Sequence, residues 1–330
     1  MPSDTQVAAG KSIHRRTGKT FYLATRFLPE RVRHPTYVLY GFFRIADQVV
    51  DGPDPGPPAE QRAELQSIRE AVLGDADPDD PVLAAFREVA DRHGIADGDI
   101  EVFLDAMEQD IDTDRYPTRA ALREYMDGSA AAVGRMMTAV MDPDDPEAAL
   151  PHATALGEAF QLTNFLRDVR EDALDRERVY LPEETLRRFG ADAGTVLALE
   201  ANDGVADAVR AELERTEGLY RDGVAGIGYL PDDCQFPVLL AAVLYAEHHR
   251  LIRARGYDVL SGTPELSRPR KLAVLARTAY YWWRTGDPEA TFYAASAVPR
   301  EGSVDALADD QGESLVGGAL SRARDGVRWL

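Results

Sequence analysis

Apolar positions recur along most of the chain at spacings of three and four residues, the pattern of helices that bury one face. The pattern predicts helices at Thr36–Val50, Ala59–Leu73, Pro81–His93, Asp99–Asp110, Arg119–Val140, Pro146–Glu171, Val205–Gly223, Phe236–Gly256 and Arg270–Arg284. Clusters of proline and glycine separate several of these segments, and no series of alternating strands is visible. We therefore expect an all-α fold of about ten helices, a bundle large enough to enclose a deep apolar cavity.

The helical segments follow one another without a long linker or a repeat of fixed period. A length of 330 residues is within reach of one large helical domain. We predict a single domain over residues 1–330, with a core at about 12–285. The segment 286–330 is rich in Gly, Ser and Asp, and we expect it to be a partly irregular C-terminal extension.

No apolar run reaches the roughly 18 residues that a membrane-spanning helix needs. The first ten residues also lack the layout of a signal peptide. These features predict a cytoplasmic protein, and we expect a monomer. The end of the chain, 321–330, is basic and aromatic, which suggests peripheral contact with anionic lipid at the inner face of the cell membrane. A disordered or core-docked tail is the alternative.

The formal charge of −20 excludes the basic face that nucleic-acid binding requires. Lysine occurs only at Lys11, Lys19 and Lys271. Abundant acidic residues with little lysine are typical of a halophile protein, in which salt screens self-repulsion; an ordinary acidic cytosolic protein is the alternative. The single cysteine, Cys234, excludes an internal disulfide and a cysteine-based zinc cluster, and we interpret it as a packed thiol.

A first group of polar residues interrupts the apolar helix at 37–51. Tyr40, Arg44, Asp47 and Asp51 follow helical spacing and share one face. Carboxylates four residues apart lie about 6 Å apart along the axis, and both can ligate a hard cation such as Mg²⁺ through oxygen. Burying them in an apolar helix is costly unless a cation pairs with them, which distinguishes this pair from the other acidic pairs, but the motif alone leaves a metal site and a chance pair equally open.

A second group lies at 161–182 and again contains two aspartates four residues apart. Gln161, Asn164, Asp168 and Asp172 fall on one helix face, and Arg167 is adjacent. Oxygen and amide groups with flanking arginines suit a magnesium diphosphate, because arginine offers a fork of donors to phosphate oxygens. The alternative is a salt-bridged surface helix.

Other acidic pairs with the same spacing occur in this acidic chain. We interpret Asp75/Asp79 and Asp110/Asp114 as solvated. Only the two pairs that lie in apolar or amide-rich faces are therefore taken as candidate metal ligands.

From about residue 12 to 285 the sequence resembles the squalene/phytoene synthase family, and phytoene synthases most of all. The resemblance rests on the N-terminal segment Lys19–Pro29, the aspartate-rich helix 37–51, the tyrosine and small-residue motif Tyr125–Gly134, and above all the signature Gln161–Pro182. The chain departs from the family pattern with Gln48 where an acidic residue is common, Thr20 where serine is usual, and Thr17 and Gly18 where some members have hydroxyl or histidine side chains.

The resemblance implies a class I isoprenoid synthase fold, a helical bundle around a central cavity. It implies that Asp47, Asp51, Asn164, Asp168 and Asp172 hold Mg²⁺, with Mn²⁺ as an alternative. Tyr40 and Tyr125 would join the four aspartates as catalytic residues, and substrate contacts would come from Arg44, Gln161, Asn164, Arg167, Tyr245 and Arg268.

The implied activity is that of a prenyltransferase in carotenoid biosynthesis. It would condense two geranylgeranyl diphosphates to phytoene through a cyclopropyl diphosphate, with no need for NADPH. Two alternatives stay open: a squalene or dehydrosqualene synthase that uses farnesyl diphosphate, and a non-catalytic assembly factor of the same fold. The intact aspartates argue against the assembly factor.

Overall fold

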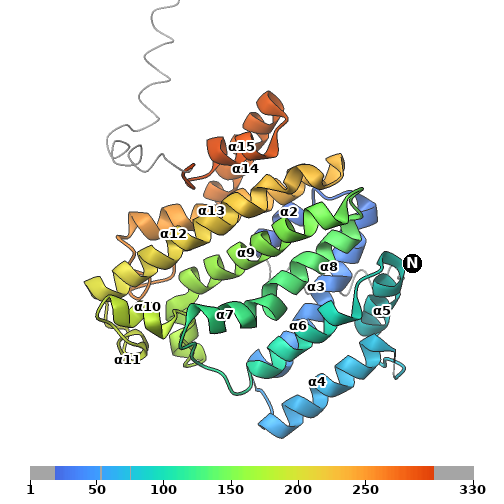
Figure 1. Ribbon diagram of the computed structural model, residues 1–330, viewed down its shortest axis with the longest axis horizontal. Coiled ribbons are helices and arrows are strands. Elements are labelled where there is room, and N and C mark those ends of the chain that lie inside the picture. The colour runs from blue at the N-terminus through green and yellow to red at the C-terminus, as the bar shows by residue number, and fades with distance from the viewer. Residues whose placement is uncertain (1–18, 53, 75, 301–330) are drawn as a thin grey trace, which may run out of the picture. The chain divides into compact units, whose positions relative to one another are not determined.

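The computed structural model describes residues 19–52, 54–74 and 76–300, and within them the chain is helical (Figure 1). The α-helices are α2 Lys19–Thr25, α3 Glu30–Asp51, α4 Pro58–Leu73, α5 Pro81–His93, α6 Asp97–Gln109, α7 Arg119–Met126, α8 Ala132–Met141, α9 Pro146–Asp175, α10 Glu183–Arg188, α11 Ala193–Leu197, α12 Asp203–Ala225, α13 Asp232–Ala254, α14 Arg268–Thr285 and α15 Pro288–Ala295. A π-helix, η1, occupies Asp127–Ala131, and a 3₁₀ turn, η2, occupies Ile227–Tyr229. None of these helices is both long enough and apolar enough to cross a bilayer.

This architecture confirms the all-α prediction, and each longer helix predicted from the sequence is present. The boundaries differ most in α3, which begins at Glu30 and accommodates Pro35 instead of starting after it. The predicted helix 119–140 is divided into α7, η1 and α8. The segment after Gly286, which was expected to be partly irregular, contains the helix α15. That helix has an aspartate cap, because Asp287 accepts from the Ala290 amide at 2.6 Å, and Pro288 at its first position.

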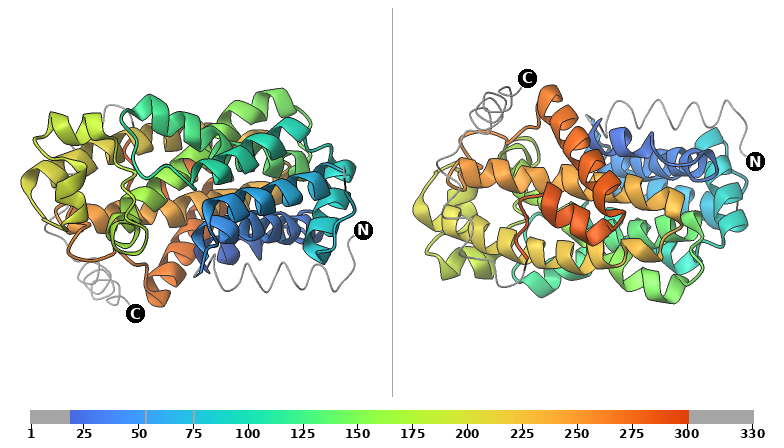
Figure 2. Two further views of the ribbon diagram at one scale, coloured as in Figure 1. Left: turned by 90° about the horizontal axis from the view of Figure 1, so that it is seen from below. Right: turned by 90° about the horizontal axis from the view of Figure 1, so that it is seen from above.

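Helix α9 is the central element of the compact unit that extends to Val298 (Figures 1 and 2). It packs against α8, α12, α13 and η1, while α3 packs against α4, α5, α6 and α8. One apolar cluster fills the space between α3 and α4–α6, where Phe42 stacks on Phe86 at 3.9 Å between ring centroids. A second cluster fills the space around α12 and α13. The two candidate metal-binding helices, α3 and α9, thus each have one face fixed by the core.

A buried polar network joins α9, α12 and α13. The Thr163 hydroxyl lies 2.9 Å from the Tyr220 hydroxyl and 3.0 Å from His249 Nε2. His249 Nδ1 lies 3.2 Å from Glu217 Oε1, and Arg253 donates to both Glu217 oxygens at 2.7 Å. Burial lowers the pKa of His249 and keeps it neutral. Because these groups satisfy one another, they fix the rotation of α9 without contacting the cavity described below.

The close approach of α12 to α9 depends on Gly223. A Cβ atom added there would lie 2.8 Å from the backbone nitrogen and the Cβ atom of Leu156. We expect Gly223→Ala to lower the free energy of unfolding by about 1–3 kcal/mol, because the helices must separate to admit the methyl group. Urea unfolding followed by circular dichroism measures this change.

Gly218→Ala provides the matched control on the same helix. Its added Cβ would meet only the end of the Arg221 side chain, at 3.7 Å. This variant should be as stable as the wild type or gain up to about 1 kcal/mol, because alanine favours helix over glycine. Equal stability of the two variants would contradict the packing role of Gly223.

Candidate active site

A cavity of 1530 Å³ lies between α3 and α9 and continues among α2, α8 and α13. Pockets for ordinary small ligands measure about 300–1000 Å³, so this cavity can hold larger molecules. The structure brings every site residue singled out from the sequence to its wall: Tyr40, Arg44, Asp47, Asp51, Tyr125, Gln161, Asn164, Arg167, Asp168, Asp172, Tyr245 and Arg268. Residues more than 120 positions apart in the chain, such as Asp47 and Asp168, therefore share one site.

The cavity has a polar end and an apolar end. Ala149 and Asp172 on α9 both line it, and at 1.5 Å per residue they lie about 35 Å apart along the helix. The lining of α9 changes from Ala149, Ala153 and Leu156 at one end to acidic side chains at the other. A long apolar molecule with a charged head would fit this polarity.

Helix α3 presents the first aspartate pair to the cavity because its opposite face is buried in the core. Arg44 Nη1 donates to Asp47 Oδ2 at 2.5 Å. Even so, burial raises the pKa of Asp47, and the neighbouring Asp51 contributes. The Nε atom of Arg44 is buried without a hydrogen-bond partner among the described residues, so the guanidinium retains donor capacity for an anion.

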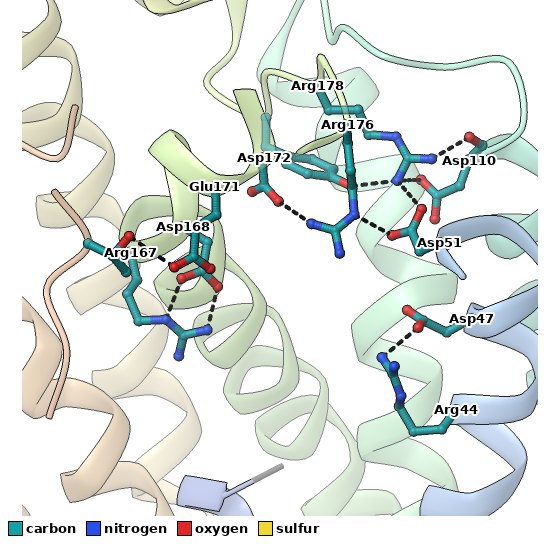
Figure 3. A network of polar contacts seen from close by, with 12 residues as sticks. Arg44, Asp47, Asp51, Asp110, Arg167, Asp168, Glu171, Asp172, Arg176 and Arg178 are labelled. Atoms are coloured by element: carbon teal, nitrogen blue, oxygen red, sulfur yellow. Dashed lines mark hydrogen bonds and ion pairs between the residues drawn. The ribbon is translucent and has the colours of Figure 1, made fainter. Parts of the chain in front are cut away.

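Helix α9 presents the second pair from across the cavity (Figure 3). Arg167 donates from Nε to Asp168 Oδ1 at 2.6 Å and from Nη2 to the other oxygen. The Asn164 side chain is hydrogen-bonded to that of Tyr245 on α13. The sequence predicted that Asn164, Arg167 and Asp168 contact metal or substrate. In this structure each of these side chains is hydrogen-bonded to another protein side chain at the cavity wall.

Arg176 connects the two aspartate pairs, a role that the sequence interpretation missed. Its Nε lies 3.1 Å from Asp51 Oδ2, and its Nη1 donates to Asp172 Oδ1 at 3.1 Å. Figure 3 shows this side chain between α3 and the end of α9. One guanidinium thus neutralises carboxylates that come from both halves of the site.

Arg178 forms a second, deeper connection. Its Nη1 donates to Asp51 Oδ1 at 2.9 Å and its Nη2 to the Asp110 carbonyl oxygen at 2.6 Å. The side chain is only 9% exposed. Arg176, Arg178 and Tyr180 lie within the signature 161–182, so their place in it was the signal that could have identified them.

The interpretation of Asp110 as solvated was wrong. Asp110 is the C-cap residue of α6 and contacts Arg178. It is only 7% exposed. The Tyr125 hydroxyl donates to its carboxyl Oδ2 at 2.9 Å. Asp114 and Asp79 are exposed, as expected, while Asp75 lies outside the described residues. Burial of Asp110 arises from tertiary packing, to which residue spacing gives no clue.

Aromatic rings form the wall beside Asp110. Tyr180 stacks on Phe165 at 3.8 Å between centroids and also contacts Tyr116 and Tyr125. Burial raises the pKa values of all three tyrosines, so they stay neutral. This wall is apolar and electron-rich, an environment that excludes water and stabilises a nearby cation through ring faces.

The buried carboxyl groups predict a specific pH dependence of stability. Burial raises the pKa values of Asp110 and Asp172 from 3.8 to about 7, so between these pH values the folded protein binds more protons than the unfolded chain. In the presence of a chelator, the free energy of unfolding should therefore fall as the pH rises from about 4 to about 7. Urea unfolding at a series of pH values measures the slope.

Asp110→Asn should reduce this slope, because an amide does not titrate, and other carboxyl groups whose pKa values are raised, including Asp172 and Asp47, should keep part of it. Asp105→Asn is the control, since Asp105 lies on the same helix with a 65% exposed side chain, and it should keep the wild-type slope. An unchanged slope in Asp110→Asn would contradict the assignment.

The donor set fits Mg²⁺. Four carboxylates and the Asn164 amide offer only oxygen ligands from side chains, and burial raises the pKa values of Asp47 and Asp172 although arginines lie nearby. Within the described ranges, however, no three acidic, histidine or cysteine side chains form a ready-made cluster for a metal ion. The residues suit an ion that keeps water or phosphate oxygens in its shell, which is how proteins usually bind Mg²⁺.

Comparison with known proteins gives consistent results. The squalene/phytoene synthase family profile matches residues 14–270. The chain is similar to the 15-cis-phytoene synthase of Synechococcus elongatus, with 32% identity over 279 residues that cover 80% of this chain and 89% of that protein. It is also 32% identical to the presqualene diphosphate synthase of Rhodopseudomonas palustris over 268 residues, 79% of this chain and 93% of that protein. Among solved structures, a dehydrosqualene synthase in complex with a ligand aligns with a TM-score of 0.76 and 28% identity, covering 85% of this chain and 97% of that one.

Proposed function

The chain belongs to the squalene/phytoene synthase family, a family of prenyltransferases, and from this premise we propose that it condenses two geranylgeranyl diphosphates head to head to form phytoene. The observation that carries the proposal is that both aspartate pairs lie at the polar end of one cavity, whose apolar wall continues along α9. The similarity to a 15-cis-phytoene synthase supports the choice of product.

The first task of the site is to bind two diphosphate groups at its polar end. Arg44, Arg167 and Arg176 line this end, each engaged with an aspartate. A diphosphate offers these guanidinium groups stronger bidentate acceptors than a single carboxylate does. The arginines would turn from the aspartates to the phosphate oxygens and leave the carboxylates available for metal.

Asp47, Asp51, Asn164, Asp168 and Asp172 would hold Mg²⁺ or Mn²⁺, which when bound neutralises charge on the departing diphosphate. The arginines contribute positive charge at the same place. Departure of the first diphosphate leaves an allylic cation, and the double bond of the second substrate attacks it. Loss of one proton then gives a cyclopropyl diphosphate.

The second half of the reaction needs no reductant. Departure of the second diphosphate opens the cyclopropane ring, the 1–1′ bond forms, and loss of a second proton gives phytoene. Tyr40, Phe43, Tyr125 and Tyr245 line the cavity and would stabilise the cationic intermediates through their ring faces. Phe42, which also lies on α3, packs in the core against Phe86 and does not line the cavity. A departing diphosphate serves as the proton acceptor.

A second candidate is condensation of two farnesyl diphosphates to squalene or dehydrosqualene. It is favoured by equal identity to a presqualene diphosphate synthase and by similarity to a dehydrosqualene synthase structure. The two candidates share the polar end of the site and differ in the length of chain that the apolar end must hold.

Product analysis separates these candidates. The purified protein is incubated with Mg²⁺ and either geranylgeranyl or farnesyl diphosphate, with and without NADPH, and the hydrocarbon products are identified by chromatography and mass spectrometry. We expect a C40 product from geranylgeranyl diphosphate that does not depend on NADPH. A C30 product formed at higher kcat/KM would reject the phytoene proposal, and an NADPH requirement would indicate squalene.

A further inference from the structure

Helix α14 carries an apolar stripe on its solvent-facing side. Only Val274 and Thr278 of its 18 residues are buried. Leu272 is 63% exposed, Tyr280 50% and Trp283 81%. Six large apolar side chains are exposed among the described residues, and these three of them lie on α14. The exposed stripe repeats at helical spacing: Pro269, Leu272, Ala273, Ala276, Ala279, Tyr280 and Trp283. Helices of soluble proteins normally turn such a stripe toward the core.

The same helix concentrates positive charge in a strongly acidic chain. Helix α14 contains no Asp or Glu, whereas the whole chain has a formal charge of −20. On a helical wheel at 100° per residue, basic side chains flank the stripe on both sides: Arg268 and Lys271 on one, and Arg270, Arg277 and Arg284 on the other. This is the arrangement of a helix that lies in a membrane interface.

Buried Glu247 does not cancel this charge. Its Oε1 lies 2.7 Å from Arg270 and 3.5 Å from Arg250, and its Oε2 accepts from Arg277 at 2.9 Å. One carboxylate thus faces three guanidinium groups, which leaves two positive charges in excess. The contacts hold α14 against α13 (Figures 1 and 2). The side chains of the stripe are exposed on this helix.

The stripe begins at the cavity. Arg268, Lys271 and Leu272 line the cavity wall, while Tyr280 and Trp283 lie two to three turns further along α14. A surface that contacts the stripe would therefore also contact the edge of the cavity.

We propose that α14 docks flat on an anionic lipid surface, with Leu272, Tyr280 and Trp283 inserted among the lipids and the flanking arginines against the headgroups. Charge complementarity favours lipid as the occupant, since the helix is the basic surface of an acidic protein. A symmetric dimer through α14 would place two basic faces against each other, because a two-fold interface pairs the same patch on both copies. Docking would open the cavity toward the bilayer, where long prenyl chains partition; this last consequence rests on the proposed function, whereas docking itself does not.

Vesicle co-sedimentation of the full chain tests the proposal. Vesicles of phosphatidylcholine alone are compared with vesicles that contain phosphatidylglycerol, at low and high salt. We expect binding to the anionic vesicles that weakens with salt. The double variant Trp283→Ser/Tyr280→Ser should bind at least about tenfold more weakly, since two inserted side chains are lost. It should keep the wild-type melting temperature and its activity on detergent-dispersed substrate, because neither residue lines the cavity.

Leu174→Ser is the matched control, because Leu174 is 55% exposed and lies on α9, outside the stripe. It should bind vesicles as the wild type does.

Equal binding of the double variant and the wild type, or equal binding to neutral and anionic vesicles, would overturn the proposal. If the double variant instead changes the mass measured by light scattering without lipid, the stripe contacts a second copy. If only deletion of 301–330 abolishes binding, the tail is the anchor. Product formation is measured separately, so failure of docking leaves the proposed reaction standing.

Discussion

Asp168→Asn is expected to lower kcat by about 10²–10³-fold, the loss seen when one preorganised electrostatic contact to a transition state is removed. The substitution keeps the shape of the side chain and removes its charge, so the Mg²⁺ concentration needed for half-maximal rate should also rise. Asp168 lies on the cavity wall with its side chain 20% exposed, held by Arg167. Release of diphosphate from geranylgeranyl diphosphate, followed over a Mg²⁺ titration, measures both effects.

Asp175→Asn removes the same charge from the same helix and provides the control. Asp175 is exposed and does not line the cavity, so kcat and the Mg²⁺ requirement should stay at wild-type values. Diphosphate release at the wild-type rate in Asp168→Asn would reject the metal-binding role of α9. Circular dichroism of both variants tests whether the fold is retained, so that a loss of activity can be assigned to the site.

Arg178→Met should destabilise the fold by about 3 kcal/mol or more, the loss expected when one partner of a buried ion pair is removed. Asp51 would lose its contact at 2.9 Å, and the Asp110 carbonyl oxygen would lose its donor at 2.6 Å. Methionine fills a similar volume but offers no donor. Activity should fall as well, because Asp51 would keep only Arg176 to orient it. Urea unfolding at pH 7.5 and the product assay measure the two effects.

Arg187→Met is the comparison for Arg178→Met. Arg187 pairs with Glu183 on the surface of α10, with its own side chain 58% exposed, and such pairs contribute about 0–1 kcal/mol. A similar stability change in both variants would show that Arg178 is not a buried connection between α3, α6 and the end of α9.

The fold was predictable because helical periodicity is a local property. The core faces of α3, α5 and α9 follow directly from apolar residues three and four positions apart. The π-helix at 127–131 was not predicted. It packs closely on α6, since a Cβ atom at Gly128 would lie 2.1 Å from the Val102 carbonyl oxygen, and this tertiary contact cannot be seen in the residue spacing. Helix α15 was predictable from its Asp287 cap and Pro288. The Gly, Ser and Asp content of the whole segment 286–330 indicated irregular structure instead.

The aspartate pairs were identified because the apolar surroundings in sequence made their charges conspicuous. Asp110 was missed for the opposite reason: its contact with Arg178 joins residues 68 positions apart, and the residues around Asp110 in sequence do not indicate that contact. The twelve site residues line one cavity, yet Arg176 shows that the contact between the two halves of the site comes from a side chain outside both aspartate pairs.

The length of α9 has a consequence for how such an enzyme can diversify. One continuous helix of 30 residues carries both the acidic end of the cavity and, about 35 Å away, its apolar end. Substitutions that far apart, with no shared partners, change free energies additively to within about 0.5 kcal/mol. In the proposed reaction, substitutions around Ala149 and Leu156 can therefore adapt the apolar end to a different prenyl chain while the polar end near Asp168 stays unchanged. This chain is 32% identical both to a phytoene synthase and to a presqualene diphosphate synthase, so overall identity does not distinguish between these two activities.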